Sequence, residues 1–130
     1  MDNFTVGENK YGKYAIIPSS QHRAVARRII QGEVWEPLTL NYIRDLNLNK
    51  AIIHAGAFFG DFLPPIRTFY PDLEIYTFEP GSINYLALLK TIELNKLTNI
   101  KTYNLALGAT NCEVNLHVGK DGEHKSHRCV

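Results

Sequence analysis

The sequence predicts an α/β fold built on a parallel sheet, and three observations support this prediction. An apolar strand at 51–54 runs into a glycine-containing turn and a helix start. A second strand, 74–78, follows one helix later and ends at Glu79, and a third strand spans 100–105. Strands that alternate with helices through short links are joined by right-handed crossovers and form a parallel sheet.

The helices between these strands are delimited by prolines. Proline is tolerated only in the first helical turn, so Pro64 and Pro65 require the first helix to begin within a residue or two of Asp61. That helix ends before Pro71, and Ser82 is expected to cap a longer second helix. The first strand shows no apolar alternation, so we expect helices on both faces of the sheet.

Residues 1–49 are expected to form an N-terminal region that packs on the end of the sheet. The predicted elements are a short strand at 14–17, a helix that begins at Ser19 or Ser20, and a second helix that begins at Glu36. Residues 50–118 would then hold the nucleotide-type half-domain.

The C-terminal region contains one further strand and a tail. Apolar and polar residues alternate over 112–118, which predicts an antiparallel strand with one solvent-facing side. We expect this strand to form a hairpin with the strand at 100–105. Residues 119–130 are polar and are predicted to be a loose tail.

The composition is that of a single globular domain. The 130 residues are 45% hydrophobic and 21% charged. The formal charge of +1 is made of interspersed acids and bases, so charge indicates neither a nucleic-acid nor a membrane partner. No signal segment or long apolar run is present, which predicts a cytoplasmic location.

The cysteines and histidines near the C-terminus suggest no special chemistry. Cys112 and Cys129 lie in dissimilar settings and are expected to be free thiols. His124, His127 and Cys129 are too few for a zinc site without a fourth ligand or a fixed frame. No metal is predicted.

The glycine spacing indicates which cofactor the turn accepts. Dinucleotide-binding turns need a middle glycine so that the backbone can approach a pyrophosphate. Here the spacing is Gly56-x-x-x-Gly60, and Phe58 stands where that glycine would fall. Glu79 follows about 20 residues later, where doubly wound folds hold a ribose. S-adenosylmethionine carries a ribose and no phosphate, so it fits this pattern better.

Several ordered motifs resemble the FkbM-type S-adenosylmethionine-dependent methyltransferases. The similar segments, which span residues 32–118, are Gly32–Pro37, His54–Asp61, Phe78–Pro80, Asn84–Tyr85, Leu88–Asn95 and Asn104–Gly108. The resemblance implies a partial class I methyltransferase fold, a Rossmann-like parallel sheet with N-terminal helices and an added antiparallel strand.

The resemblance also implies a cofactor site. Gly56 and Gly60 would line the turn, and Glu79 would accept hydrogen bonds from both ribose hydroxyls. The predicted cofactor-binding residues are Glu36, His54, Gly56, Ala57, Phe58, Gly60, Asp61, Glu79 and Pro80. No catalytic residue is assigned.

Three of these residues keep a second interpretation. The family commonly has an acidic residue where His54 stands, and a structural histidine is as compatible with this position as a cofactor contact. Asp61 or Phe62 is expected to cap the helix that follows, and a capping role would explain Asp61 without a cofactor contact. Glu36 is equally explained as a solvated glutamate at a helix start.

The family continues past this region with a fourth strand that pairs along the free side of the first. We therefore expect the cofactor-binding half here and an exposed edge on the strand at 51–54. A strand at 14–17, a second copy of the chain, or a continuation would cover it, and we expect the chain to self-associate or to be marginally stable.

The predicted function is O-methylation of a sugar or small metabolite as methyl acceptor. One alternative is a catalytically inactive fragment or nucleoside-binding module with the same fold. A nicotinamide oxidoreductase is a second alternative, which the missing middle glycine argues against.

Overall fold

A three-stranded parallel sheet forms the centre of the protein. The computed structural model describes the backbone of residues 3–118 and 123–130, and the side chains of 3–116, 129 and 130. The sheet order is β3-β4-β5, and both strand pairs are parallel and in register. The three strands are β3 (Ile52–Ala55), β4 (Ile75–Phe78) and β5 (Ile100–Tyr103). The predicted α/β class and parallel sheet are confirmed.

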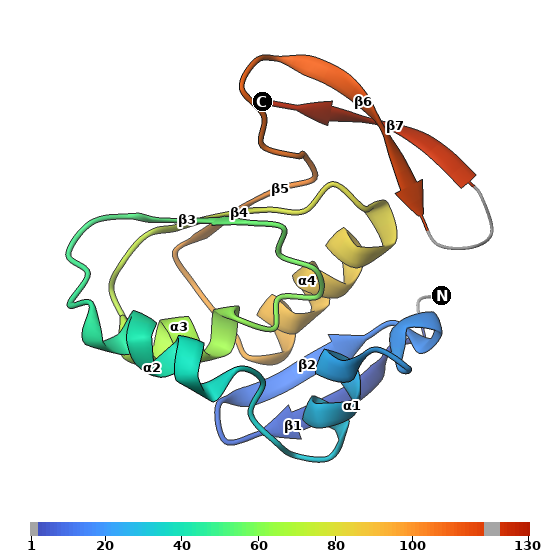
Figure 1. The fold of residues 1–130 in the computed structure, drawn as a ribbon. Helices are drawn as coiled ribbons and strands as arrows, with labels where there is room; N and C mark the ends of the chain where they lie inside the picture. The colour runs from blue at the N-terminus through green and yellow to red at the C-terminus, as the bar shows by residue number, and fades with distance from the viewer. Residues whose placement is uncertain (1–2, 119–122) are drawn as a thin grey trace.

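Both crossover helices lie on the same side of this sheet. They are α3 (Leu63–Phe69) and α4 (Ser82–Leu94), and Figure 1 shows them together beneath the strands. Ser82 is the first helical residue of α4 and does not cap it, because Gly81 holds the capping position. The proline argument for the start of α3 is confirmed, since Pro64 and Pro65 lie in its first turn.

The opposite face of the sheet is open, so the prediction of helices on both faces is wrong. Ile53 is 70% exposed there, whereas Ile75 and Thr77, which face the helices, are fully buried. The reason is topological: beyond β5 the described chain forms a hairpin and no helix that could cover this face.

Strand β3 is an edge strand, as predicted, and the N-terminal strand does not cover it. That strand, β2 (Gly12–Ile16), pairs antiparallel with β1 (Thr5–Asn9), an element that the sequence analysis missed. Polar contacts hold β2 on α4. The Ala15 N–H donates to Thr91 Oγ1 at 3.0 Å, and the Asn95 side chain bonds both backbone groups of Lys13.

The N-terminal helices pack on two different partners. A 3-10 turn, η1 (Pro18–Ser20), comes first, so α1 (Ala24–Ile30) begins later than Ser19 or Ser20. Helix α1 packs on β1. Helix α2 (Pro37–Asp45) packs on α3, and the Tyr70 hydroxyl donates to a carbonyl at the end of α2. The prediction that both helices pack across the end of the sheet is therefore wrong, because α1 packs on β1 and α2 packs on α3.

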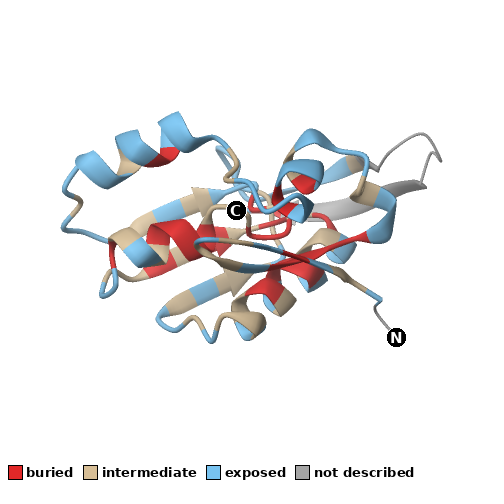
Figure 2. Ribbon diagram, turned by 90° about the horizontal axis from the view of Figure 1, so that it is seen from below, coloured by how far each residue is buried: buried red, intermediate tan, exposed pale blue. Residues whose placement is uncertain are grey.

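Two hydrophobic clusters meet at the turn after β3. The first joins β2, α1 and α4 and includes Tyr14, Ile29 and Phe59. The second joins α3, α4 and β4 and includes Leu63 and Ile75. Figure 2 shows the buried residues concentrated in the middle of the molecule, so the turn after β3 is held from two sides.

The C-terminal strands form their own antiparallel hairpin, which corrects two expectations. Strand β6 (Cys112–Val118) pairs with β7 (Glu123–Cys129) and not with β5. Residues 123–129 are therefore a strand and not a loose tail; residues 119–122 lie outside the described residues. The exposed fraction of Val114 is 42% and Leu116 is half-buried, so neither of these apolar side chains of β6 is fully buried.

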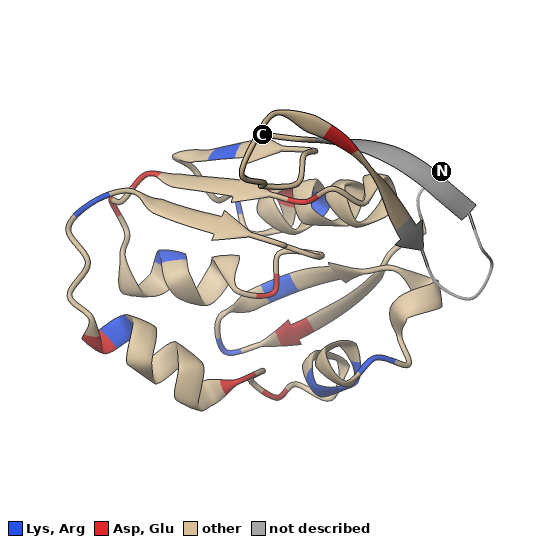
Figure 3. Ribbon diagram, turned by 45° about the horizontal axis from the view of Figure 1, so that its top comes forward, with Lys and Arg blue, Asp and Glu red and all other residues tan. Residues whose placement is uncertain are grey.

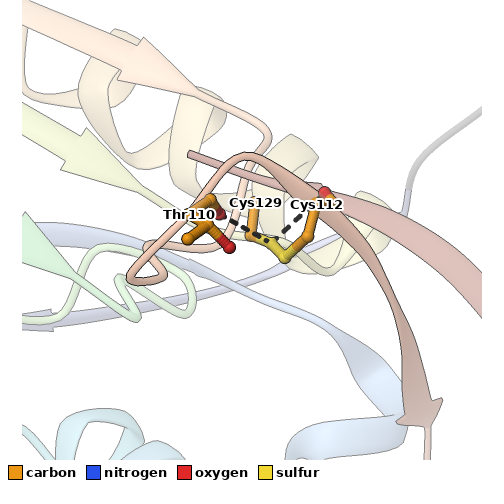
Figure 4. Close-up of a disulfide and its surroundings, with 3 residues drawn as sticks. All are labelled: Thr110, Cys112 and Cys129. Carbon is orange, nitrogen blue, oxygen red and sulfur yellow. Dashed lines mark hydrogen bonds between the residues drawn. A yellow bond between two sulfur atoms is a disulfide. The ribbon is translucent and has the colours of Figure 1, made fainter.

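The free-thiol prediction is wrong, because Cys112 and Cys129 form a disulfide. The two residues are directly opposite in the β6–β7 register, and Figure 4 shows the bond beside Thr110. Cys129 is therefore not available as a metal ligand, and the side chains of His124 and His127 lie outside the described residues. Disulfides persist mainly in oxidising surroundings. This bond therefore does not support the predicted cytoplasmic location.

Charge is distributed without a dominant patch. Figure 3 shows acidic and basic residues interspersed along the described chain, and four ion pairs neutralise exposed side chains there. None of the described helices is long and apolar enough to cross a membrane.

Candidate functional site

In the turn after β3, two fully buried side chains flank a half-buried one. Ala57 is fully buried beside α3 and α4, and Phe59 is fully buried beside Tyr14. Between them, Phe58 has a φ of 53°, in the left-handed region that costs a non-glycine residue about 1 kcal/mol. The two buried neighbours hold Phe58 in this conformation.

Glu79 stands at the end of β4 with its carboxylate fixed by the backbone. The Phe58 N–H donates to Oε1 and the Gly81 N–H donates to Oε2, each at 2.8 Å. The residue is only 6% exposed. Because an ionised carboxylate has about four acceptor sites, these two bonds leave capacity for two more. Glu79 is therefore positioned at the turn, as the sequence predicted.

The two glycines of the turn have different surroundings. Gly56 has a φ of 70°, and a Cβ added there would meet nothing within 4 Å. Gly60 has a φ of 81°, and a Cβ there would lie 3.0 Å from Leu88 Cδ1. Gly56 therefore borders open space that a ligand can approach, whereas Gly60 allows the turn to pack on α4.

Asn104 fixes the backbone after β4, a role that the sequence analysis did not assign. Its Nδ2 donates to the carbonyl oxygens of Glu79 at 2.8 Å and Pro80 at 3.2 Å. Asn104 follows β5, the neighbour of β4. The signal that could have identified it is its position, because the carboxyl ends of adjacent parallel strands meet at one edge.

His54 has a structural partner within the sheet. Its Nδ1 lies 3.0 Å from Thr77 Oγ1 on β4, and its ring packs edge-on against Phe62. Burial lowers the pKa of His54 to about 4, so the imidazole is neutral at neutral pH. Because His54 also lines a cavity, the structural and the cofactor-contact interpretations both stand.

Asp61 does not cap α3, so that interpretation of it is wrong. Phe62 holds the capping position, and no side chain caps the helix. Burial, with a smaller contribution from the charge of Glu36, raises the pKa of Asp61 to about 7. Glu36 itself is exposed and precedes α2 with a φ of 48°. Together these residues place acidic groups at one end of the turn.

A cavity of about 520 Å³ runs along the free edge of β3 towards α2. Predicted site residues in its lining are His54, Gly56, Phe58 and Asp61. The rest of the lining is largely apolar and includes Ile43, Leu46 and Ile66. Glu36, Ala57, Gly60, Glu79 and Pro80 are not among the lining residues. The turn thus separates an apolar cavity from the fixed carboxylate of Glu79.

The two buried titratable groups should oppose each other in the pH dependence of stability. The folded-state pKa of Asp61 is about 7 against an ordinary 3.8, so stability falls as pH rises between these values. The folded-state pKa of His54 is about 4 against 6.5, so stability rises with pH between those values. The two effects have opposite signs over nearly the same pH range, so we expect the free energy of unfolding of the wild type to change little across it.

In the Asp61→Asn variant, His54 alone should determine how stability changes with pH in this range. Without the carboxyl, the free energy of unfolding should increase by about 2 kcal/mol from acid to near-neutral pH. Urea unfolding at a series of pH values measures this. If the free energy of unfolding of the variant depends on pH as little as that of the wild type, the buried Asp61 carboxyl does not offset His54 in the wild type.

The comparison with known proteins gives structural matches only. No family model and no curated protein sequence matches the chain. The tRNA (uracil-54, C5)-methyltransferase of Pyrococcus abyssi, solved with S-adenosyl-L-homocysteine, superposes with a TM-score of 0.56 at 12% identity. The match covers 77% of this chain and 23% of that one.

Two further matches are TYW2 proteins. The P. horikoshii protein, solved with MeSAdo, has a TM-score of 0.58 at 16% identity, covering 82% of this chain and 37% of that one. The M. jannaschii protein, solved with AdoMet, has a TM-score of 0.53 at 17% identity, covering 78% and 43%. The chain thus spans less than half the length of these structures. It is structurally similar to this tRNA methyltransferase and to TYW2 proteins solved with AdoMet and MeSAdo, and it has a partial class I methyltransferase fold.

Proposed function

We propose that this chain binds S-adenosylmethionine at the carboxyl edge of β3 and β4. The observation that carries the proposal is the Glu79 carboxylate, which the backbone N–H groups of Phe58 and Gly81 fix at the glycine turn. A ribose diol would use its two remaining acceptor sites in charge-assisted hydrogen bonds. The likeness to structures solved with S-adenosyl-L-homocysteine, AdoMet and MeSAdo supports the same ligand class.

We further propose a methyltransferase of the FkbM type with a sugar or small-metabolite hydroxyl as acceptor. The sequence motifs around Gly56, Glu79 and Asn104 support this finer assignment. S-adenosylmethionine supplies an electrophilic methyl group. The protein contributes by aligning the acceptor oxygen with it and by excluding water, which is mainly an orientation effect.

A nucleoside-binding module without catalysis is the second candidate, and one observation favours it. The face of the sheet that carries Ile53 is open, and the edge of β3 has no partner strand in the described chain. Such a surface does not exclude water from an acceptor. The nicotinamide alternative is opposed by Phe58, whose side chain occupies the position where a pyrophosphate requires glycine.

Isothermal titration of the full chain with S-adenosylmethionine, S-adenosylhomocysteine and NAD tests the proposal. We expect both adenosyl compounds to bind in the micromolar range and NAD to bind at least about tenfold more weakly. A folded sample that binds neither adenosyl compound contradicts the proposal. Preferential NAD binding would revive the oxidoreductase interpretation.

A further inference from the structure

Arg23 is a cation seated on the aromatic ring of the glycine turn. It is exposed and has extended backbone angles immediately before α1. Its guanidinium carbon lies 5.6 Å from the centroid of the Phe58 ring, within the range of a cation–π interaction. Its backbone N–H donates to the Ser20 carbonyl at 3.0 Å. Both ends of the residue are therefore positioned.

Phe58 connects this cation to the fixed carboxylate of the site. The backbone N–H of Phe58 donates to Glu79 Oε1, while its ring lies against Arg23. The left-handed conformation of Phe58 lets one residue make both contacts. Arg23 and Glu79 are therefore held at the same turn through opposite parts of Phe58.

The charge distribution leaves Arg23 available to an anion. The ion pairs between described residues involve Arg28, Arg44, Lys90 and Lys101, and Arg23 is in none of them. The lining of the adjacent cavity contains no lysine or arginine. A ligand carboxylate at the turn would find no cation in the cavity lining, whereas Arg23 stands beside Phe58.

We propose that Arg23 binds the carboxylate of the amino-acid tail of the adenosyl cofactor, and that Phe58 orients it for this purpose. The inference rests on the proposed function and adds to it the recognition of the tail. Arginine suits this role because its planar guanidinium can pair with a carboxylate while it stacks on an aromatic ring. It would act as a specificity residue for ligands that carry the tail.

Two ligands that differ in the tail separate this contact from the rest of the site. S-adenosylhomocysteine carries the carboxylate, and 5′-methylthioadenosine lacks it. Isothermal titration of Arg23→Gln should show S-adenosylhomocysteine affinity reduced by about tenfold or more and methylthioadenosine affinity changed by less than about twofold. Arg23→Lys should retain part of the affinity for S-adenosylhomocysteine, because it keeps the charge but loses the planar group.

Arg27→Gln is the matched control, because Arg27 is an exposed arginine of α1, the helix that Arg23 precedes. It should leave both affinities unchanged. Equal losses for the two ligands in Arg23→Gln, or no loss for either, would overturn the role of Arg23 while the proposed function stands. Wild-type protein that binds neither ligand would overturn both proposals.

Discussion

Replacing Glu79 with glutamine should reduce the affinity for S-adenosylhomocysteine by at least about a hundredfold, because the charge-assisted hydrogen bonds to the ribose diol are lost. The variant should also be less stable. Both carboxylate oxygens accept backbone N–H groups, from Phe58 and Gly81, and an amide can accept only one of them. We expect the free energy of unfolding to fall by about 1–3 kcal/mol. Isothermal titration and urea unfolding measure the two effects.

Two control variants separate recognition from stability. Glu74→Gln removes a carboxylate that precedes β4, where Glu74 pairs with Lys101 at the surface, and it should leave ligand affinity unchanged. Thr77→Val removes the buried hydrogen-bond partner of His54. It should destabilise the protein but leave the proposed contact between Glu79 and the ribose hydroxyls intact. If the Glu79→Gln variant binds S-adenosylhomocysteine as tightly as the wild type, Glu79 does not bind the ribose hydroxyls.

The wild-type chain should self-associate through the free edge of β3, and Ile53→Lys should weaken this at least about tenfold. Unpaired N–H and C=O groups on an apolar edge strand favour pairing with another strand. Ile53 is 70% exposed on the open face of the sheet and lines both the edge cavity and an apolar hollow beside Tyr76, Phe78 and Leu107. A lysine there introduces like charges at the contact of two copies. Sedimentation velocity at increasing concentrations measures the change.

Ile30→Lys is the matched control for this experiment. Ile30 is a partly exposed isoleucine of α1, away from the β3 edge, so this variant should associate as the wild type does. A wild-type chain that stays monomeric at all concentrations and melts cooperatively at high temperature would refute the association proposal.

The central sheet could be predicted because its strands carry their own signal. Strands β3, β4 and β5 lie within one or two residues of the predicted 51–54, 74–78 and 100–105, since each is a short segment rich in β-branched or aromatic residues between turn residues. The prolines of α3 located that helix for the same local reason. The place of Glu79 at the sheet edge follows from the rule that parallel strands end together.

The strands that were missed depend on a partner more than on their own pattern. Strand β7 is polar along its length and is specified by its register with β6. That register brings Cys112 opposite Cys129, so the disulfide could not be inferred from their separation in sequence. Strand β1 is similarly defined by pairing with β2.

The sequence by itself determined the order of strands and helices from β3 to β5, the glycine turn and the acidic residue at the end of β4, because these depend on local apolar patterns and backbone sterics. Only the tertiary structure decided the detailed surroundings of the site. It showed that Gly60 packs on Leu88 while Gly56 stays open, that Phe58 links Glu79 to Arg23, and that one face of the sheet is uncovered. These features arise from contacts between residues far apart in the chain. A local sequence pattern does not show which distant residue will pack against a given position.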